Sequence, residues 1–165
     1  MGISIDKDDL TRPSSSRKYS LGEVYVDYSS TDSIKPKYVY VKSHGALTAS
    51  QPYQVSYSNT VGSEVISKAP ATIGSGACIG VSSVSVSSGD YVWLQYGGKA
   101  SVLCTDTVAA GDFVEVINAG TGLKLDGGVS GSTVEAATSV GIAVTAGSGA
   151  QTIVLSGKGV QVAAS

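Results

Sequence analysis

Long apolar runs, cysteines and charged side chains are all scarce in this sequence of 165 residues. No apolar run approaches the roughly 18 residues that a membrane-spanning helix needs, so we expect no association with a membrane. The segment Met1 to Tyr19 lacks the apolar stretch of a signal peptide, which predicts a protein that is soluble and intracellular when it is made. Two cysteines are too few for a disulfide scaffold or a four-ligand zinc site. We expect Cys78 and Cys104 to behave as small buried hydrophobic residues.

Charged residues make up 15% of the chain, with 11 basic and 13 acidic side chains and a net charge of -2. Affinity for nucleic acid comes largely from basic patches, so this balance gives no reason to expect nucleic-acid binding. The charges are uneven, because residues 1–42 hold 13 of the 24 and the other 123 residues hold 11. The two regions therefore face different surroundings or have different functions.

Groups that could carry out catalysis are equally few. His44 is the one histidine, no G-x-S-x-G motif occurs, and the glycines at 74, 76 and 80 have the wrong spacing for a dinucleotide-binding loop. His44, Cys78 and Cys104 show no metal-ligand spacing, so we expect no metal site and no cofactor. The sequence predicts a protein that is not an enzyme. A small hydrolase that uses His44 with one of the serines is a weaker alternative.

Valine and isoleucine dominate the apolar residues: Val and Ile total 31, whereas Leu and Met total 9. This balance is typical of strands rather than helices and predicts one all-β domain. Residues 23–28 and 38–42 alternate with a period of two, which predicts two strands. In both, the valines lie on one face and Tyr25, Tyr38 and Tyr40 lie on the other. This tyrosine stripe is either a wall of the core or a contact surface for a partner.

A repeat divides the second half of the chain into short β units. The segment VSSGDYVWLQYGGKASVL (86–103) aligns without gaps on VAAGDFVEVINAGTGLKL (108–125). Each copy has a Gly-Asp pair that predicts a turn before a strand, and later glycines that we expect to end the strand. A fainter echo relates residues 78–98 to residues 139–159. Chance similarity between two β segments of low complexity is the alternative explanation.

The first 20 residues combine short apolar stretches with scattered charges, Pro13 and a run of serines. Such a segment does not offset its own ordering entropy, so we predict an extended N-terminal arm at residues 1–20. A single β domain at 21–165 follows, with a tyrosine-rich hairpin region at 21–62 and a repeat-containing body at 70–160. A frayed terminus without a function is the alternative for the arm.

The order of five motifs resembles the small capsid decoration proteins of tailed bacteriophages, also called cement or head-stabilising proteins. The motifs are ACIGV at 77–81, SGDYVWL at 88–94, VAAGDFV at 108–114, VGIAV at 140–144 and TIVLSG at 152–157. The resemblance implies a compact β-barrel or β-tulip body with Gly-rich turns. It also implies a homotrimer on the outer surface of the phage head that stabilises the expanded capsid by bridging neighbouring capsomers. The family has no catalytic residues or cofactor.

In related decoration proteins the N-terminal segment reaches onto the shell, and the resemblance assigns that function to the arm. An arm of this kind gains main-chain hydrogen bonds by adding a strand to a sheet edge of the major capsid protein. Apolar anchors and basic residues facing an acidic shell would supply the side-chain contacts: Ile3, Ile5, Leu10, Arg12, Arg17, Lys18 and Tyr19. The second hypothesis is a phage tail or fibre module, or another host-facing β-sandwich. It would bind sugar or protein through tyrosines such as Tyr38, Tyr40, Tyr53 and Tyr57.

Overall fold

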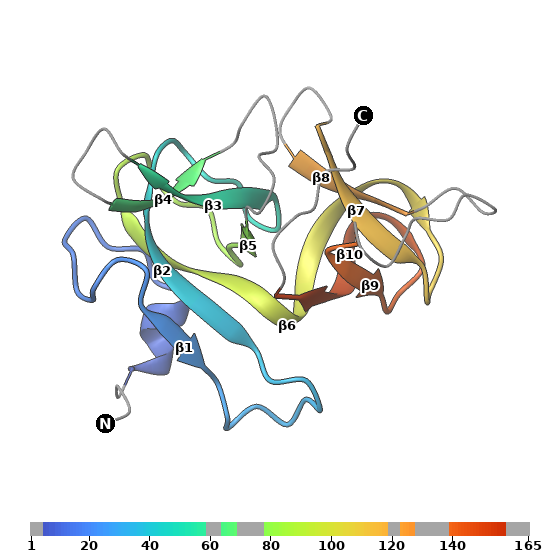
Figure 1. Cartoon of the computed structure of the whole chain (residues 1–165), viewed down its shortest axis with the longest axis horizontal. Coiled ribbons are helices and arrows are strands. Elements are labelled where there is room, and N and C mark those ends of the chain that lie inside the picture. The colour runs from blue at the N-terminus through green and yellow to red at the C-terminus, as the bar shows by residue number, and fades with distance from the viewer. Residues whose placement is uncertain (1–4, 59–63, 69–77, 119–122, 128–138, 158–165) are drawn as a thin grey trace.

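The computed structural model of the protein describes residues 5–58, 64–68, 78–118, 123–127 and 139–157 (Figure 1). Its elements, in chain order, are the 3-10 helix η1 (Lys7–Leu10) and the strands β1 (Val24–Val26), β2 (Lys37–Ser43), β3 (Pro52–Ser58), β4 (Glu64–Lys68), β5 (Cys78–Val81), β6 (Tyr91–Val108), β7 (Phe113–Asn118), β8 (Leu123–Gly127), β9 (Gly141–Ala143) and β10 (Gly147–Ser156). The all-β fold class is therefore confirmed. No helix within the described ranges is long and apolar enough to cross a membrane.

The ten strands form one sheet in the order β1-β2-β4-β3-β5-β6-β10-β9-β7-β8. Most neighbouring strands are antiparallel, whereas β2 with β4 and β6 with β8 run parallel. Two further pairings, β2 with β6 and β8 with β6, fold the sheet back on both sides of β6. The sheet is not closed into a barrel, which corrects the expectation of a β-barrel. Strand β1 takes no part in these further pairings: among the described strands it alone pairs on one side only and leaves an open edge.

Strand β6 passes through the whole molecule (Figure 1). Its first part, Tyr91 to Gln95, pairs with β2, and residues 97–108 pair with β10. We call β1–β5 with the first part of β6 the N-terminal half, and the rest the C-terminal half. Gly97 and Gly98 lie inside β6, so the prediction that these glycines end the strand is wrong. Gly98 has a φ of 78°, and a Cβ there would lie 2.9 Å from the Cα of Pro36.

The Gly-Asp turns of the sequence repeat occupy equivalent places in the two halves. Gly89 and Gly111 both have a positive φ, 88° and 95°, which glycine adopts without strain. The Gly89 N–H donates to the Ser43 carbonyl at the end of β2 at 3.0 Å, and the Gly111 N–H donates to the Ala143 carbonyl at the end of β9 at 2.8 Å. Both turns lead directly into a strand, β6 or β7. The predicted repeat is therefore confirmed at its turns.

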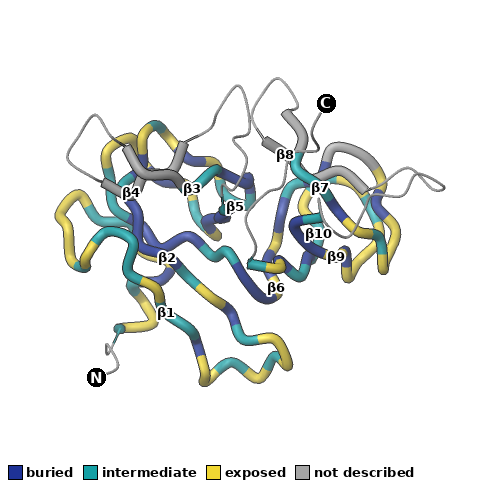
Figure 2. Tube along the Cα trace, in the orientation of Figure 1, coloured by how far each residue is buried: buried dark blue, intermediate teal, exposed yellow. Residues whose placement is uncertain are grey.

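Strand β2 is covered on both faces, and this explains its alternating sequence. Val39 and Val41 point into an aliphatic cluster that includes Leu94 of β6. Tyr40, on the opposite face, is equally buried, with 2% of its surface exposed. Figure 2 shows the resulting buried stretch in the middle of β2. A second aliphatic core fills the C-terminal half and consists mainly of Val102, Val108, Val114, Ala143, Ile153 and Leu155.

Candidate functional site

Aromatic side chains gather on the tyrosine face of β2. The antiparallel register sets Tyr40 of β2 opposite Trp93 of β6, and their ring centroids lie 5.1 Å apart. Tyr25 of β1 lies opposite Tyr38 of β2, at 6.3 Å between ring centroids. We call the group formed by Tyr19, Tyr25, Tyr38, Tyr40, Tyr91 and Trp93 the aromatic cluster. The period-two alternation of β1, β2 and β6 brings the strand members of this cluster to one face, and Tyr19 joins them from the N-terminal segment.

The N-terminal segment covers the aromatic cluster. Leu10, at the end of η1, is 8% exposed and packs with Tyr40 and Trp93. The Tyr19 ring lies 5.2 Å from the rings of both Tyr40 and Trp93. Residues 5–20, which we call the docked arm, therefore differ from the extended arm predicted from the sequence. The aromatic cluster offers this segment enough apolar surface to offset its ordering entropy.

Hydrogen bonds fix the backbone of the docked arm to the sheet. Ser14 and Tyr91 exchange two backbone hydrogen bonds, at 3.0 Å and 2.8 Å, as a short antiparallel bridge. The Lys18 N–H donates to the Tyr40 hydroxyl at 3.1 Å. The docked arm is therefore an integral part of the fold of the N-terminal half.

Asp9 joins two parts of the docked arm. Its carboxylate accepts hydrogen bonds from the Lys18 ammonium at 2.6 Å and from the Tyr19 hydroxyl at 2.7 Å. The bond from Lys18 holds the pKa of Asp9 below its usual value, and the bond from Tyr19 acts in the same direction. The same contact with Asp9 raises the pKa of Tyr19 to about 12. Ionised Asp9 and neutral Tyr19 are therefore the forms that stabilise the docked arm.

We predict that Asp9→Asn destabilises the protein by about 1 kcal/mol at pH 7, because half-exposed Lys18 loses a charged partner and water screens part of that loss. Since folding lowers the pKa of Asp9, its contribution is present above about pH 4 and is lost as the pH falls through the folded value. The difference between variant and wild type in urea unfolding should shrink below that pH. Asp8→Asn, at an exposed ion pair with Arg12, is the control and should change stability by less than about 0.5 kcal/mol. Equal effects of the two changes would contradict the prediction.

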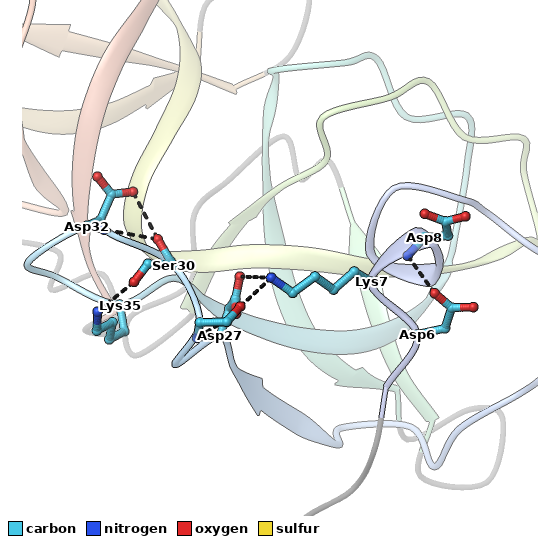
Figure 3. Close-up of polar contacts among 8 residues, drawn as sticks. Asp6, Lys7, Asp8, Asp27, Ser30, Asp32 and Lys35 are labelled. Atoms are coloured by element: carbon cyan, nitrogen blue, oxygen red, sulfur yellow. Dashed lines mark hydrogen bonds and ion pairs between the residues drawn. The ribbon is translucent and has the colours of Figure 1, made fainter.

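The loop between β1 and β2 is tied to the docked arm by Lys7. The Lys7 ammonium reaches from η1 to the Asp27 carboxylate at 3.6 Å and also contacts the Ser29 hydroxyl (Figure 3). Asp27 is buried, and the hydrogen bond from the Ser29 hydroxyl lowers its pKa. On the other side of the loop, Asp32 pairs with Lys99 of β6 at 3.1 Å. The loop thus bridges η1 and the C-terminal half.

The predicted arm residues divide into a buried set and an exposed set. Ile3 lies outside the described residues. Ile5 and Leu10 pack against the aromatic cluster and Tyr19 is part of it, so their apolar surface is used within the chain. Arg12, Arg17 and Lys18 lie on the outer side of the docked arm. Arg12 pairs with Asp8 at 3.8 Å, and the Arg17 Nε donates to the Tyr19 carbonyl at 3.0 Å. A shallow polar depression is lined by Arg17, Lys18, Tyr19, Ser20 and Glu23.

The tyrosines that could have bound a sugar are largely covered. Tyr40 is buried under the docked arm, and Tyr25 and Tyr38 are partly buried beside it. Tyr53 is 3% exposed, and its hydroxyl accepts a hydrogen bond from the Thr48 N–H at 2.7 Å. The side chain of Tyr57 lies outside the described residues. The stripe therefore acts as a wall of the core, which is one of the two alternatives left open by the sequence.

Two exposed apolar groups were missed by the sequence analysis. One lies on β1 and the loop that follows it, where Val24, Tyr28 and Ile34 are exposed, Tyr28 most of all at 78%. The other lies in the C-terminal half and consists of Phe113, Ile142 and Val144. The alternation of Ile142 and Val144 in the VGIAV motif was the available signal, because such alternate positions share one face of a strand.

The glycine of that motif, Gly141, is required by packing, since a Cβ there would lie 2.5 Å from the Val154 carbonyl oxygen.

Groups that could perform chemistry remain scattered. His44 is exposed on the loop after β2. Within the described ranges, no three His, Cys, Asp or Glu side chains are grouped so that they could hold a metal ion. Cys104 is buried, as expected, and Cys78 is half-buried; the two do not form a disulfide with each other, and burial raises the pKa of Cys78 to about 11.

The architecture has a counterpart among solved structures. The chain matches the crystal structure of the N base of head fiber gp8.5 in bacteriophage phi29 with a TM-score of 0.51. The fold resembles that of a phage head-fibre base. The match covers 76% of this chain and 98% of the fibre base, at 14% sequence identity, so the likeness concerns the fold. No protein-family model and no curated protein matches the sequence.

Proposed function

We propose that the protein is a structural component of a phage virion that binds the outer surface of the head. The observation that carries this proposal is the shared fold with the head-fibre base over 76% of the chain. The order of motifs that resembles decoration proteins points in the same direction. In this proposal the chain is made in the host cytoplasm, has no enzymatic activity and needs no cofactor.

The finer proposal is a homotrimer that stabilises the expanded capsid by bridging neighbouring capsomers. Its partner is the major capsid protein. Because Ile5, Leu10 and Tyr19 are used within the chain, the contact would come from the outer side of the docked arm, where Arg12 and Arg17 are exposed. Three copies of this contact on one trimer engage the shell together, and effective concentration raises the avidity by about 100-fold or more.

Deleting residues 1–20 would not test the contact, because it also removes part of the packing around the aromatic cluster. The double variant R12E/R17E keeps that packing and reverses two exposed charges. We predict that its occupancy on purified expanded heads falls at least about 10-fold while its thermal unfolding is unchanged, since exposed charge contacts affect partner binding more than stability. Occupancy would be measured by quantitative gel analysis of heads after sedimentation. Lys37→Glu, an exposed reversal on β2, is the control. Full occupancy of R12E/R17E would refute the contact, and failure of the wild type to bind heads would refute the function.

A second candidate follows from the name of the structural neighbour, which is the base of a head fibre. In that case the chain is the base through which a longer fibre attaches to the head. A fibre would then project from the head wherever this chain is bound. Electron microscopy of virions labelled with an antibody to this chain distinguishes the two candidates: label at the foot of projecting fibres supports the fibre base, and label on the head surface without fibres supports the decoration protein.

A further inference from the structure

A polar pocket lies where the two halves of the molecule meet. Its lining comes from the loop between β2 and β3, from β5 and the loop after it, and from both parts of β6. The lining residues are Ser50, Val81, Ser83, Gln95, Ala100 and Ser101. The pocket has a volume of about 280 Å³. Pockets for drug-sized ligands begin at roughly 300 Å³, so this one suits a smaller molecule.

Ser50 places a hydroxyl at a backbone position that other turns of this chain give to glycine. The turn before β3 is closed by a hydrogen bond from the Gln51 N–H to the Thr48 carbonyl at 3.2 Å, and its third residue, Ser50, has a φ of 62°. The two Gly-Asp turns are closed by the same bond, at 3.2 Å and 3.1 Å, and their third residues are Gly89 and Gly111. In the part of the chain that the structure describes, Ser50 is the one residue other than glycine with a positive φ. Strained residues of this kind gather at binding sites, which points to a function for the Ser50 side chain.

The main chain holds Ser50 firmly, whereas its hydroxyl is held loosely. The Ser50 N–H donates to the Ser82 carbonyl at 2.8 Å, and the Ser50 carbonyl accepts from the Leu103 N–H at 2.8 Å. The Ser50 hydroxyl donates to the Ser101 hydroxyl across 3.4 Å, which is long for a bond between two oxygens. The two hydroxyls can therefore exchange this contact for shorter bonds to a ligand.

Gln95 has one hydrogen-bonding group left to offer a ligand. Its Nε2 donates to the Gly97 carbonyl at 3.1 Å and to the Lys99 carbonyl at 2.7 Å. Both amide protons are used in these two bonds, and they fix the orientation of the amide. The remaining group is the oxygen Oε1, which accepts hydrogen bonds from a hydroxyl or an N–H.

The pocket is neutral and has an apolar part. Among the described residues, no charged side chain lines it. Lys99 is next to the lining residue Ala100, but its ammonium pairs with Asp32 at 3.1 Å. A charged ligand would lose hydration in the pocket without gaining a partner, so the lining favours a neutral one. Val81 and Ala100 are buried and supply apolar surface.

We propose that this pocket binds a neutral sugar residue. A sugar ring presents hydroxyl groups that both donate and accept hydrogen bonds, and it also presents faces of C–H bonds. The hydroxyls of Ser50 and Ser101 and the Oε1 of Gln95 match the first, and the surface of Val81 and Ala100 matches the second. This inference goes beyond the proposed function and does not depend on it.

The test is an NMR titration of the ¹⁵N-labelled protein with D-glucose, D-galactose, D-mannose and N-acetyl-D-glucosamine. We expect at least one of these sugars to shift the amide signals of Ser50, Gln95 and Ser101 in a saturable way, with a dissociation constant of about 1 mM or less. The methyl glycosides of the same sugars form a second arm. Equal binding of a methyl glycoside assigns the site to a sugar at the end of a chain, and binding of the free sugar alone assigns it to a monosaccharide.

The variants Ser50→Gly and Ser101→Ala each remove one hydroxyl from the pocket. We expect each to raise the dissociation constant at least about 10-fold, because a hydrogen bond to the ligand is lost. S50G also relieves the strained backbone, so its Tm should equal or exceed that of wild type. Ser88→Ala is the control, since Ser88 is an exposed serine of a Gly-Asp turn outside the pocket. It should bind the sugar as wild type does.

The inference is overturned if none of the four sugars gives a saturable shift, or if the shifts lie away from the pocket. It is also overturned if S50G and S101A bind as well as wild type. A lower Tm of S50G together with unchanged binding would show that Ser50 serves the fold alone. None of these measurements involves phage heads, so their failure leaves the proposed function standing, and failure of the wild type to bind heads leaves the sugar site standing.

Discussion

Replacing Trp93 with alanine is expected to lower the free energy of unfolding by about 3–5 kcal/mol. Trp93 is 1% exposed and contacts the docked arm, β1 and β2 through the rings of Tyr19, Tyr25 and Tyr40. Its truncation leaves a cavity between rigid rings. Because these rings cannot easily move in to fill the cavity, the free energy of unfolding falls by the full loss of packing. Urea unfolding followed by circular dichroism measures the effect, since the variant has no tryptophan to report by fluorescence.

Trp93→Phe is the matched comparison for this prediction. The indole Nε1 is buried and has no hydrogen-bond partner among the described residues. Phenylalanine therefore loses part of the packing and no hydrogen bond, so we expect a cost of about 1–2 kcal/mol. A cost for W93F as large as that for W93A would contradict the view that an aromatic ring at this position holds the cluster together by packing.

Leu10→Asp is expected to release the docked arm while the rest of the sheet stays folded. Leu10 is buried against Tyr40 and Trp93, and an aspartate there would place an unpaired carboxylate among aromatic rings. The resulting loss of about 2 kcal/mol or more converts to roughly a 30-fold larger population of the undocked arm. Trypsin reports this directly, because Arg17 and Lys18 lie within the arm and neither is followed by proline. Cleavage rates should rise by about the same factor, since they follow the population of the open form.

Ser15→Asp is the control for arm release, because Ser15 lies on the same segment and is exposed. It adds the same charge without entering the aromatic cluster, and its trypsin cleavage should match that of wild type. Fluorescence of Trp93 gives a second measurement, with a red shift expected in L10D and none in S15D. If L10D is cleaved no faster than S15D, the packing of Leu10 does not hold the arm.

Local sequence patterns predicted a good part of the fold. The alternation at residues 23–28 and 38–42 corresponds to β1 and β2, and the two Gly-Asp pairs mark the turns before β6 and β7. The length of β6 was not predictable in the same way. Gly97 and Gly98 read locally as the end of a strand, but pairing with β2 on one side and β10 on the other carries the ladder through them.

The site was harder to predict, because its parts are far apart in the sequence. Alternation alone placed Tyr38 and Tyr40 on one face of a strand. What covers that face depends on Trp93, more than 50 residues later, and on Leu10 in a segment with no regular pattern. The charges of the first 20 residues favoured an extended segment, whereas in the structure Asp9 pairs with Lys18 inside the same segment. An ion pair of this kind cannot be predicted from the composition, because the composition gives the number of charges and not which of them lie together.

The continuous strand β6 has a mechanical consequence. The N-terminal and C-terminal halves share this one continuous strand, which is hydrogen-bonded to β2 in its first part and to β10 in its second part. Backbone hydrogen bonds lie across the strand direction, so a load that draws the two halves apart along β6 acts on many of them at once. The weak point under tension is then the open edge at β1, where one strand peels from its single neighbour bond by bond. If the two halves of the molecule were attached to two parts of an expanding surface, the pulling force would act on the long hydrogen-bonded pairings of β6 with β2 and β10.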